Sequence, residues 1–167
     1  MPHREICLVR HAIAAERGPA WPDDSARPLT ERGVARFTAI VKGLARLDVV
    51  VDEIFTSPFA RAAQTAALLA AGLPGKPQVR GLETLAPGNT PSDVLQELSR
   101  ATRRRRVALV GHEPGLGELA GHLLGIRRAL PLGKGGACHI DIERFDTRLA
   151  GELRWFLTPK VLRRLGK

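Results

Sequence analysis

The amino-acid sequence predicts an α/β fold, a three-layer α/β/α sandwich with a mostly parallel sheet and at least one antiparallel strand. Short apolar strands alternate with helices along most of the chain, which is typical of a parallel sheet with helices on both faces. The chain then ends in two strand-like segments joined by a turn near Asp146, a pair that favours antiparallel pairing. The 167 residues suit one domain spanning 1–167, with no repeat or linker to divide it.

The first half of the chain predicts two strand–helix units. The opening strand, REICLV, is apolar after its charged start, and Thr30 is suited to cap the helix that follows. Ser57 and Pro58 suit the start of the second helix, and Gly72 suits its end. The predicted elements are strands at 4–9 and within 49–56, and helices at 28–47 and 57–73; the apolar face of the first helix comprises Val34, Phe37, Ile40, Val41 and Leu44.

The second half continues the alternation and then changes to strands alone. Pro91 suits the first turn of a helix, RVALVG is a β-branched apolar strand, and Gly125 suits a helix end. The predicted elements are a short extended piece around 78–85, a helix at 91–101, a strand at 106–111, a helix at 114–125, and strands at about 136–143 and 150–157.

The amino-acid composition favours an anionic binding partner and disfavours nucleic acid. Net charge is +9, from 26 Lys and Arg against 17 Asp and Glu, which favours an anionic partner such as a phosphorylated substrate, an acidic protein face or a polyanion. Aromatic residues are only 4% and Tyr is absent, which disfavours nucleic-acid binding through base stacking.

Apolar runs and cysteines point to the cytoplasm. No apolar run approaches the ~20 residues that span a bilayer, and the N-terminal segment has no apolar stretch long enough for a signal peptide. Cys7 and Cys138 fit no metal spacing or disulfide framework, so we expect two buried, reduced thiols. We therefore expect a cytoplasmic protein that does not interact with membranes.

Three predicted strands end in Arg or His at the point where a helix follows. The first leads to Arg10 and His11, the second to SPFAR with Arg61 about one turn into its helix, and the third to His112. Ligand sites of open α/β sheets form outside the carboxyl ends of the strands, where helix N-termini add free N–H groups. If the strands are parallel neighbours, these four side chains converge, and a phosphoryl group is the ligand that suits them. Alone, each would be read as a solvated or structural residue.

His11 is the predicted nucleophile. An imidazole attacks phosphorus only when neutral, and the charges of Arg10 and Arg61 disfavour its protonation while they hold phosphoryl oxygens. An acceptor on the other ring nitrogen would fix the tautomer, and the sequence does not identify it. His112 is predicted to donate a hydrogen bond to a phosphoryl oxygen. The acidic residues and histidines show no metal-binding spacing, so no metal or cofactor is expected.

Together these segments resemble the histidine phosphatase superfamily, which includes the cofactor-dependent phosphoglycerate mutases, and they look closest to its SixA-like phosphohistidine phosphatases. The resemblance covers nearly the whole chain. The motifs that carry the resemblance are Arg10-His11 after a strand, RPLTERG (27–33), SPFARAAQTA, GHEPGLGEL and LRWFLTPKVLRRL (153–165).

The resemblance implies a phosphoglycerate mutase-like fold and a two-step phosphoryl transfer. His11 would form a covalent phosphohistidine that water hydrolyses, and Arg10, Arg61 and His112 would form the phosphate pocket. The implied substrate is a phosphohistidine on a protein, such as a histidine phosphotransfer domain. A phosphatase of small phosphate esters or a mutase is the alternative enzyme, although the chain has little spare length for a lid. A non-catalytic phosphoryl- or polyanion-binding module is the alternative outside enzymes.

Several residues leave alternatives open. Ala12 stands where the superfamily usually has Gly, which puts the local backbone geometry in question. Glu83 is either the proton donor to the leaving group or a surface carboxylate, while Glu113 is expected to serve a helix N-terminus. Arg27 either approaches the pocket mouth or caps the helix region, and we expect it to have a supporting role in substrate binding. The RRRR run at 103–106 is read first as a solvated edge and second as a docking patch for an acidic protein.

Overall fold

The computed structural model describes residues 3–145 and 150–167 and confirms the predicted fold class. One mixed sheet has the strand order β3-β2-β4-β1-β5-β6. The first four strands in this order are parallel to one another. Strand β5 pairs with β1 in the antiparallel direction, and β6 pairs with β5 in the antiparallel direction. The turn expected near Asp146 lies outside the described residues. The strands are β1 (Arg4–Arg10), β2 (Glu53–Thr56), β3 (Gln78–Gly81), β4 (Arg106–Gly111), β5 (Ala137–Ile142) and β6 (Glu152–Leu157).

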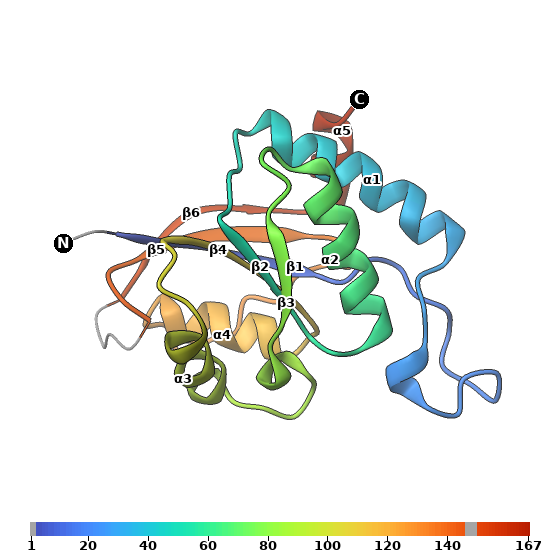
Figure 1. Ribbon diagram of the computed structural model, residues 1–167, viewed down its shortest axis with the longest axis horizontal. Coiled ribbons are helices and arrows are strands. Elements are labelled where there is room, and N and C mark those ends of the chain that lie inside the picture. The colour runs from blue at the N-terminus through green and yellow to red at the C-terminus, as the bar shows by residue number, and fades with distance from the viewer. Residues whose placement is uncertain (1–2, 146–149) are drawn as a thin grey trace.

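Helices cover both faces of the sheet (Figure 1). One layer contains α1, α2 and α5, and the other contains α3 and α4. Among the described residues no helix is long and apolar enough to cross a membrane. The helices are α1 (Glu31–Arg46), α2 (Ala60–Gly72), α3 (Pro91–Ala101), α4 (Gly115–Leu123) and α5 (Pro159–Leu165), with short 3-10 turns η1 (Asp24–Ala26) and η2 (Glu83–Leu85).

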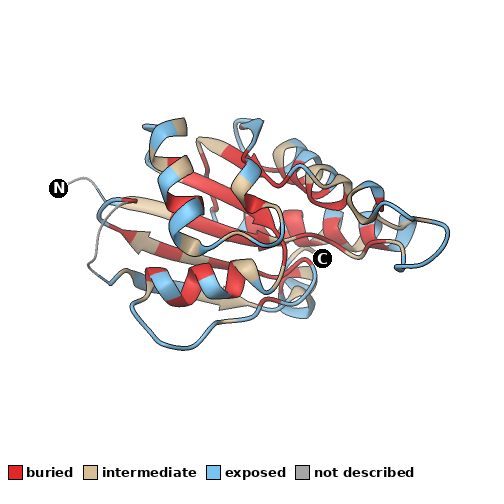
Figure 2. Cartoon of the chain, turned by 90° about the horizontal axis from the view of Figure 1, so that it is seen from below, coloured by how far each residue is buried: buried red, intermediate tan, exposed pale blue. Residues whose placement is uncertain are grey.

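The central strands are buried on both faces, which explains their continuous apolar runs (Figure 2). In β1, Ile6 and Leu8 point to the α3–α4 layer, whereas Cys7 and Val9 point to the layer of α1, α2 and α5. Cys7 and Cys138 are both buried free thiols, as expected.

Three local expectations were wrong. Val34 is 39% exposed rather than buried with the rest of its predicted face on α1. Helix α2 begins at Ala60, three residues later than predicted, and Ser57 does not cap it. Helix α5 was not expected, because it is short and is stabilised by packing on α1. The two helices approach so closely that a Cβ on Gly43 would clash with the carbonyl oxygen of Leu162.

The pairing register aligns the ends of the three strands that carry the predicted site. Arg10 at the end of β1 lies opposite Gly111 at the end of β4, and Thr56 at the end of β2 lies opposite Val110. Because all three strands are parallel neighbours, the residues that follow them emerge at one edge of the sheet. The fold therefore positions a site there.

Candidate phosphoryl-transfer site

The structure brings the two predicted histidines together at this edge. The ring centroids of His11 and His112 are 5.2 Å apart. Both rings are buried, and Arg61, which was predicted to join them, is only 2% exposed. Arg10 is partly buried beside them. Because buried cations and imidazoles need compensating partners, the hydrogen bonds of each group define what the site can do.

A backbone carbonyl sets the tautomer of His11. The Nδ1 atom lies 2.7 Å from the carbonyl oxygen of Ala12. A carbonyl only accepts hydrogen bonds, so Nδ1 carries the proton and the neutral ring keeps its lone pair on Nε2. This is the acceptor that the sequence could not identify, and it leaves Nε2 as the nucleophilic atom.

Burial, more than neighbouring charge, keeps both rings neutral. Burial lowers the pKa of His11 to about 4; Arg61, Arg10 and Lys134 lower it as well, while the hydrogen bond to Ala12 opposes them. Burial, followed by the His11 ring and Arg61, lowers the pKa of His112 to about 3. The low pKa of His11 was predicted from arginine charge, whereas in the structure burial lowers it more than either arginine does.

His112 is held by a residue that the sequence analysis took for a helix cap. Its Nε2 atom lies 2.8 Å from the hydroxyl oxygen of the fully buried Ser57. The Phe59 ring packs edge-on against the imidazole, with centroids 5.1 Å apart. Ser57 and Phe59 follow β2 directly, so the β2–α2 junction orients His112 at the end of β4.

Arg10 is oriented by the loop before β5. Its Nη1 donates to the Leu132 carbonyl at 2.9 Å, and the Leu132 N–H donates to the carboxylate of Glu113 at 3.0 Å. The second carboxylate oxygen of Glu113 accepts from the N–H of Gly117 in α4, as expected for a carboxylate serving a helix N-terminus. Burial raises the pKa of Glu113, and these hydrogen bonds and Arg10 oppose the rise.

Asp24 joins Arg61 to Arg27. Arg61 donates to the carbonyl and the carboxylate of Asp24, at 2.8 and 3.1 Å. Arg27 donates to the same carboxylate at 3.0 Å and to the Ala15 carbonyl. Hydrogen bonds and charge from Arg27 and Arg61 lower the pKa of Asp24 against the opposing effect of its desolvation. Asp24 is thus the anion that holds these buried cations in place.

Ala12 fits its position without strain. Its N–H donates to the Thr65 hydroxyl at 3.0 Å, and Thr65 donates to the Arg61 carbonyl one turn earlier in α2. Among the described residues other than Gly, positive φ occurs only at Asp48 and Lys76, so the backbone at Ala12 does not require glycine. The site therefore tolerates alanine where the superfamily usually has glycine.

Three buried nitrogens of the site have no hydrogen-bond partner among the described residues. They are Arg10 Nε, Arg61 Nε and His112 Nδ1. Unpartnered buried polar atoms are rare and costly, and functional sites are where they are expected. Two guanidinium groups and an imidazole are groups that suit the oxygens of a tetrahedral anion.

Other predicted residues lie further from this centre. Glu83 is exposed in η2, and it is not among the residues that line the cavity beside His112; its role as proton donor stays a prediction. The RRRR run lies at the opposite end of β4 from His112, with Arg103, Arg104 and Arg105 exposed and Arg106 paired with Asp52.

The family model of the histidine phosphatase superfamily (branch 1) matches residues 6–86, which include Arg10, His11 and Arg61. The chain belongs to the histidine phosphatase superfamily. A relative from Picosynechococcus, an uncharacterised protein, is 36% identical over 92% of this chain and 99% of its own length. The superfamily contains phosphatases and mutases, and the buried Arg–His cluster is the candidate active site of this chain.

Solved structures show the same fold. The protein histidine phosphatase SixA, complexed with tungstate, has a TM-score of 0.82 at 23% identity, over 95% of this chain and 99% of the other. The phosphoserine phosphatase of Entamoeba histolytica, complexed with phosphoserine, has a TM-score of 0.68 at 16% identity, over 95% and 99%. At these identities the likeness establishes the fold and leaves the substrate open.

The candidate site contains three residues whose roles were not predicted from the sequence. Asp24 precedes Arg27 by one turn, Ser57 was read as a cap, and Thr65 lies four residues after Arg61. Local spacing links two of them to predicted site residues: Thr65 lies four residues after Arg61 on α2, and Asp24 lies three residues before Arg27. The contacts of Asp24 with Arg61 and of Ser57 with His112 join segments far apart in sequence.

The low pKa values predict an unusual pH dependence. We expect His11 and His112 to remain neutral at pH 6, with His11 protonated on Nδ1, in nitrogen-15 NMR spectra. The unfolded chain binds protons near pH 6.5, whereas the folded chain resists them down to about pH 4. The free energy of unfolding should therefore fall as pH drops from 6.5 toward 4, measured by urea titration. A titration midpoint of His11 near 6.5 would contradict this.

Proposed function

We propose that the protein is a phosphatase that removes phosphoryl groups from protein phosphohistidine through a covalent intermediate on His11. The observation that carries the proposal is the hydrogen bond between His11 Nδ1 and the Ala12 carbonyl. It fixes the ring proton on Nδ1, and because burial keeps the ring neutral, the lone pair on Nε2 is free inside a cluster of cationic and polar donors. A site that only bound phosphate would gain nothing from an unprotonated imidazole there.

The proposed chemistry has two displacement steps. His11 Nε2 attacks phosphorus as the bond to the leaving nitrogen breaks; that nitrogen keeps the electron pair and takes up a proton. Water then attacks the phosphoryl group on His11, loses a proton, and releases inorganic phosphate and the neutral imidazole. Arg10 and Arg61 stabilise the charge on the phosphoryl oxygens in both steps, and His112 donates to one of them.

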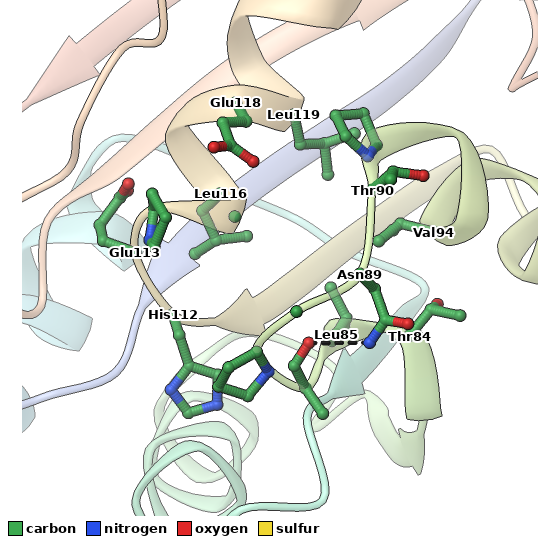
Figure 3. A pocket seen from close by; sticks show the side chains of 16 residues that line it. Thr84, Leu85, Asn89, Thr90, Val94, His112, Glu113, Leu116, Glu118 and Leu119 are labelled. Carbon is green, nitrogen blue, oxygen red and sulfur yellow. Dashed lines mark hydrogen bonds between the residues drawn. The ribbon is translucent and has the colours of Figure 1, made fainter.

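A cavity of about 330 Å³ beside His112 suits an imidazole leaving group (Figure 3). Its walls include the apolar side chains of Leu85, Leu116 and Leu119, and its charged groups are Glu113 and Glu118. Among the described residues, no Lys or Arg lines it. Such a cavity favours a neutral or protonated imidazole and disfavours a leaving group with its own carboxylate, such as phosphoglycerate.

Phosphomonoesters are the second candidate substrates, because the fold is shared with a phosphoserine phosphatase. An alcohol is a poorer leaving group than an imidazole, since its oxygen must be protonated as the bond breaks. Glu83 is the residue the sequence offers for that step, and it is exposed. This favours the phosphoramidate.

The test compares substrates on one enzyme. A histidine phosphotransfer domain phosphorylated on its histidine, phosphoserine and 3-phosphoglycerate are incubated separately with the protein, and phosphate release is measured. We expect the phosphohistidine domain to have the highest kcat/KM. Rapid quenching should trap label on the enzyme that is stable in base and lost in acid, as expected for a phosphorus–nitrogen bond.

Each alternative has its own signature. Turnover of phosphoserine with none of the phosphohistidine domain would replace the proposal with the phosphomonoesterase. Binding of the phosphorylated domain without any phosphate release would replace it with a non-catalytic module.

A further inference from the structure

A second cavity flanks the active site on the opposite side of the β1 exit. It lies between α1, α5 and the segment around Lys134 and Gly135, and its volume is about 320 Å³. Phe37, Ile40 and Pro159 contribute an apolar floor. We call this cavity the α1–α5 cleft. Its occupant must offer an apolar group.

Four cations and no carboxylate line the α1–α5 cleft. They are Arg36 of α1, Lys134 of the loop, and Lys160 and Arg163 of α5. Within the described part of the chain, none of these side chains has a hydrogen-bond or ion-pair partner. Desolvation and the nearby charges of Arg163 and Arg32 lower the pKa of Arg36. Like charges gathered without a counter-ion repel, so an anionic partner would stabilise the cluster.

The α1–α5 cleft is adjacent to the nucleophile. Ala12, which holds the His11 ring, is one of its lining residues. Lys134 on its rim is close enough to lower the pKa of His11. The Gly135 N–H donates to the carbonyl oxygens of both Arg10 and His11, at 3.1 Å each. The cleft therefore borders the residues that hold the His11 ring in place.

The positive surface extends beyond the cleft. Lys134 and Lys160 are exposed at the rim, and Arg32, which is also exposed, continues the surface along α1. A small anion in the cleft would leave these outer charges unmatched, whereas an acidic protein surface would cover them. The active-site cavity on the other side carries Glu113 and Glu118 instead, so the two flanks of the site have opposite charge.

We propose that the α1–α5 cleft docks an acidic surface of the phosphorylated protein substrate, with one apolar side chain of that protein in the cleft. The inference rests on the proposed function: a protein substrate would contact the α1–α5 cleft, whereas a small substrate would not. Complementary charge across such an interface raises the encounter rate and orients the partner. The effect of the cleft cations should therefore appear in kcat/KM and in how strongly kcat/KM depends on salt concentration.

The experiment reverses charge at the cleft and, as a control, at the far edge of the sheet. The cleft variant combines Lys160→Glu and Arg163→Glu; the control combines Arg103→Glu and Arg104→Glu and changes the net charge equally. The substrates are an acidic histidine phosphotransfer domain phosphorylated on its histidine, and the small molecule phosphoramidate. We expect the cleft variant to lose about tenfold or more in kcat/KM on the domain, with a weaker salt dependence, and under about twofold on phosphoramidate. The control should retain both activities.

Three results would overturn the inference. Equal losses on both substrates would show damage to the site, and equal losses in both variants would show an effect of net charge alone. Octyl phosphate, a small molecule with an anionic head and an apolar tail, is the probe for a small ligand. If the cleft variant lost octyl phosphate binding but kept its kinetics on the domain, the cleft would bind a small amphiphile instead. Calorimetry measures binding of the same acidic domain to the wild type and to the cleft variant. It therefore tests docking even if the wild type releases no phosphate, so failure of the proposed function and failure of this inference can be told apart.

Discussion

Replacing His11 with alanine is expected to lower kcat/KM on a phosphohistidine substrate by roughly 10⁴-fold or more and to abolish the trapped phosphoenzyme. The reason is that Nε2 of His11 is the atom proposed to bond to phosphorus, and no other imidazole in the site is placed to replace it. His112 is hydrogen-bonded through Nε2 to Ser57, and its other ring nitrogen, Nδ1, is the one proposed to donate to a phosphoryl oxygen. Phosphate release and acid-labile label, measured on the same samples, check both parts of the prediction.

The matched control for this variant is His122→Ala. His122 is an exposed histidine on α4, on the surface of the same domain. Its replacement should leave turnover and labelling intact. If His11→Ala and His122→Ala released phosphate at the same rate, His11 would not be the nucleophile.

Replacing Arg61 with alanine is expected to lower kcat/KM by about 10²- to 10³-fold. Its guanidinium is buried at the start of α2, donates two hydrogen bonds to Asp24, and would supply charge to the phosphoryl oxygens. Arg61→Lys should recover only part of the loss, because an ammonium group cannot present two parallel donors to phosphate while it also pairs with Asp24. Steady-state kinetics of the three proteins measures the difference.

Arg61→Ala also removes a partner of Asp24, so stability must be checked beside activity. Arg27 still holds the Asp24 carboxylate, and we therefore expect the variant to fold. Arg103→Ala, at the exposed far edge, is the control and should match the wild type. Wild-type kcat/KM in a folded Arg61→Ala protein would remove Arg61 from the phosphate pocket.

The structural results change how His11 is understood to stay neutral. The sequence placed two arginines near it and assigned its low pKa to their charge. In the folded chain, burial is the larger cause, and the arginine charge is shared with Asp24. A catalytic imidazole kept neutral mainly by burial is less sensitive to salt than one kept neutral by exposed charges.

The sequence by itself determined the strands, four of the five helices and the four central site residues. These follow from local signals: apolar runs such as RVALVG, a capping residue such as Thr30, and Arg or His at the end of a strand. Parallel order then follows from the alternation of strands and helices, and it brings Arg10, His11, Arg61 and His112 to one edge.

Only the tertiary structure decided which groups hold those four residues. Ser57 meets His112 across 55 residues of chain, and Asp24 meets Arg61 across 37. The short helix α5 exists as a packed element because it lies against α1, and the α1–α5 cleft arises with it. Hydrogen bonds and burial between distant segments depend on register and packing, which local residue patterns do not encode.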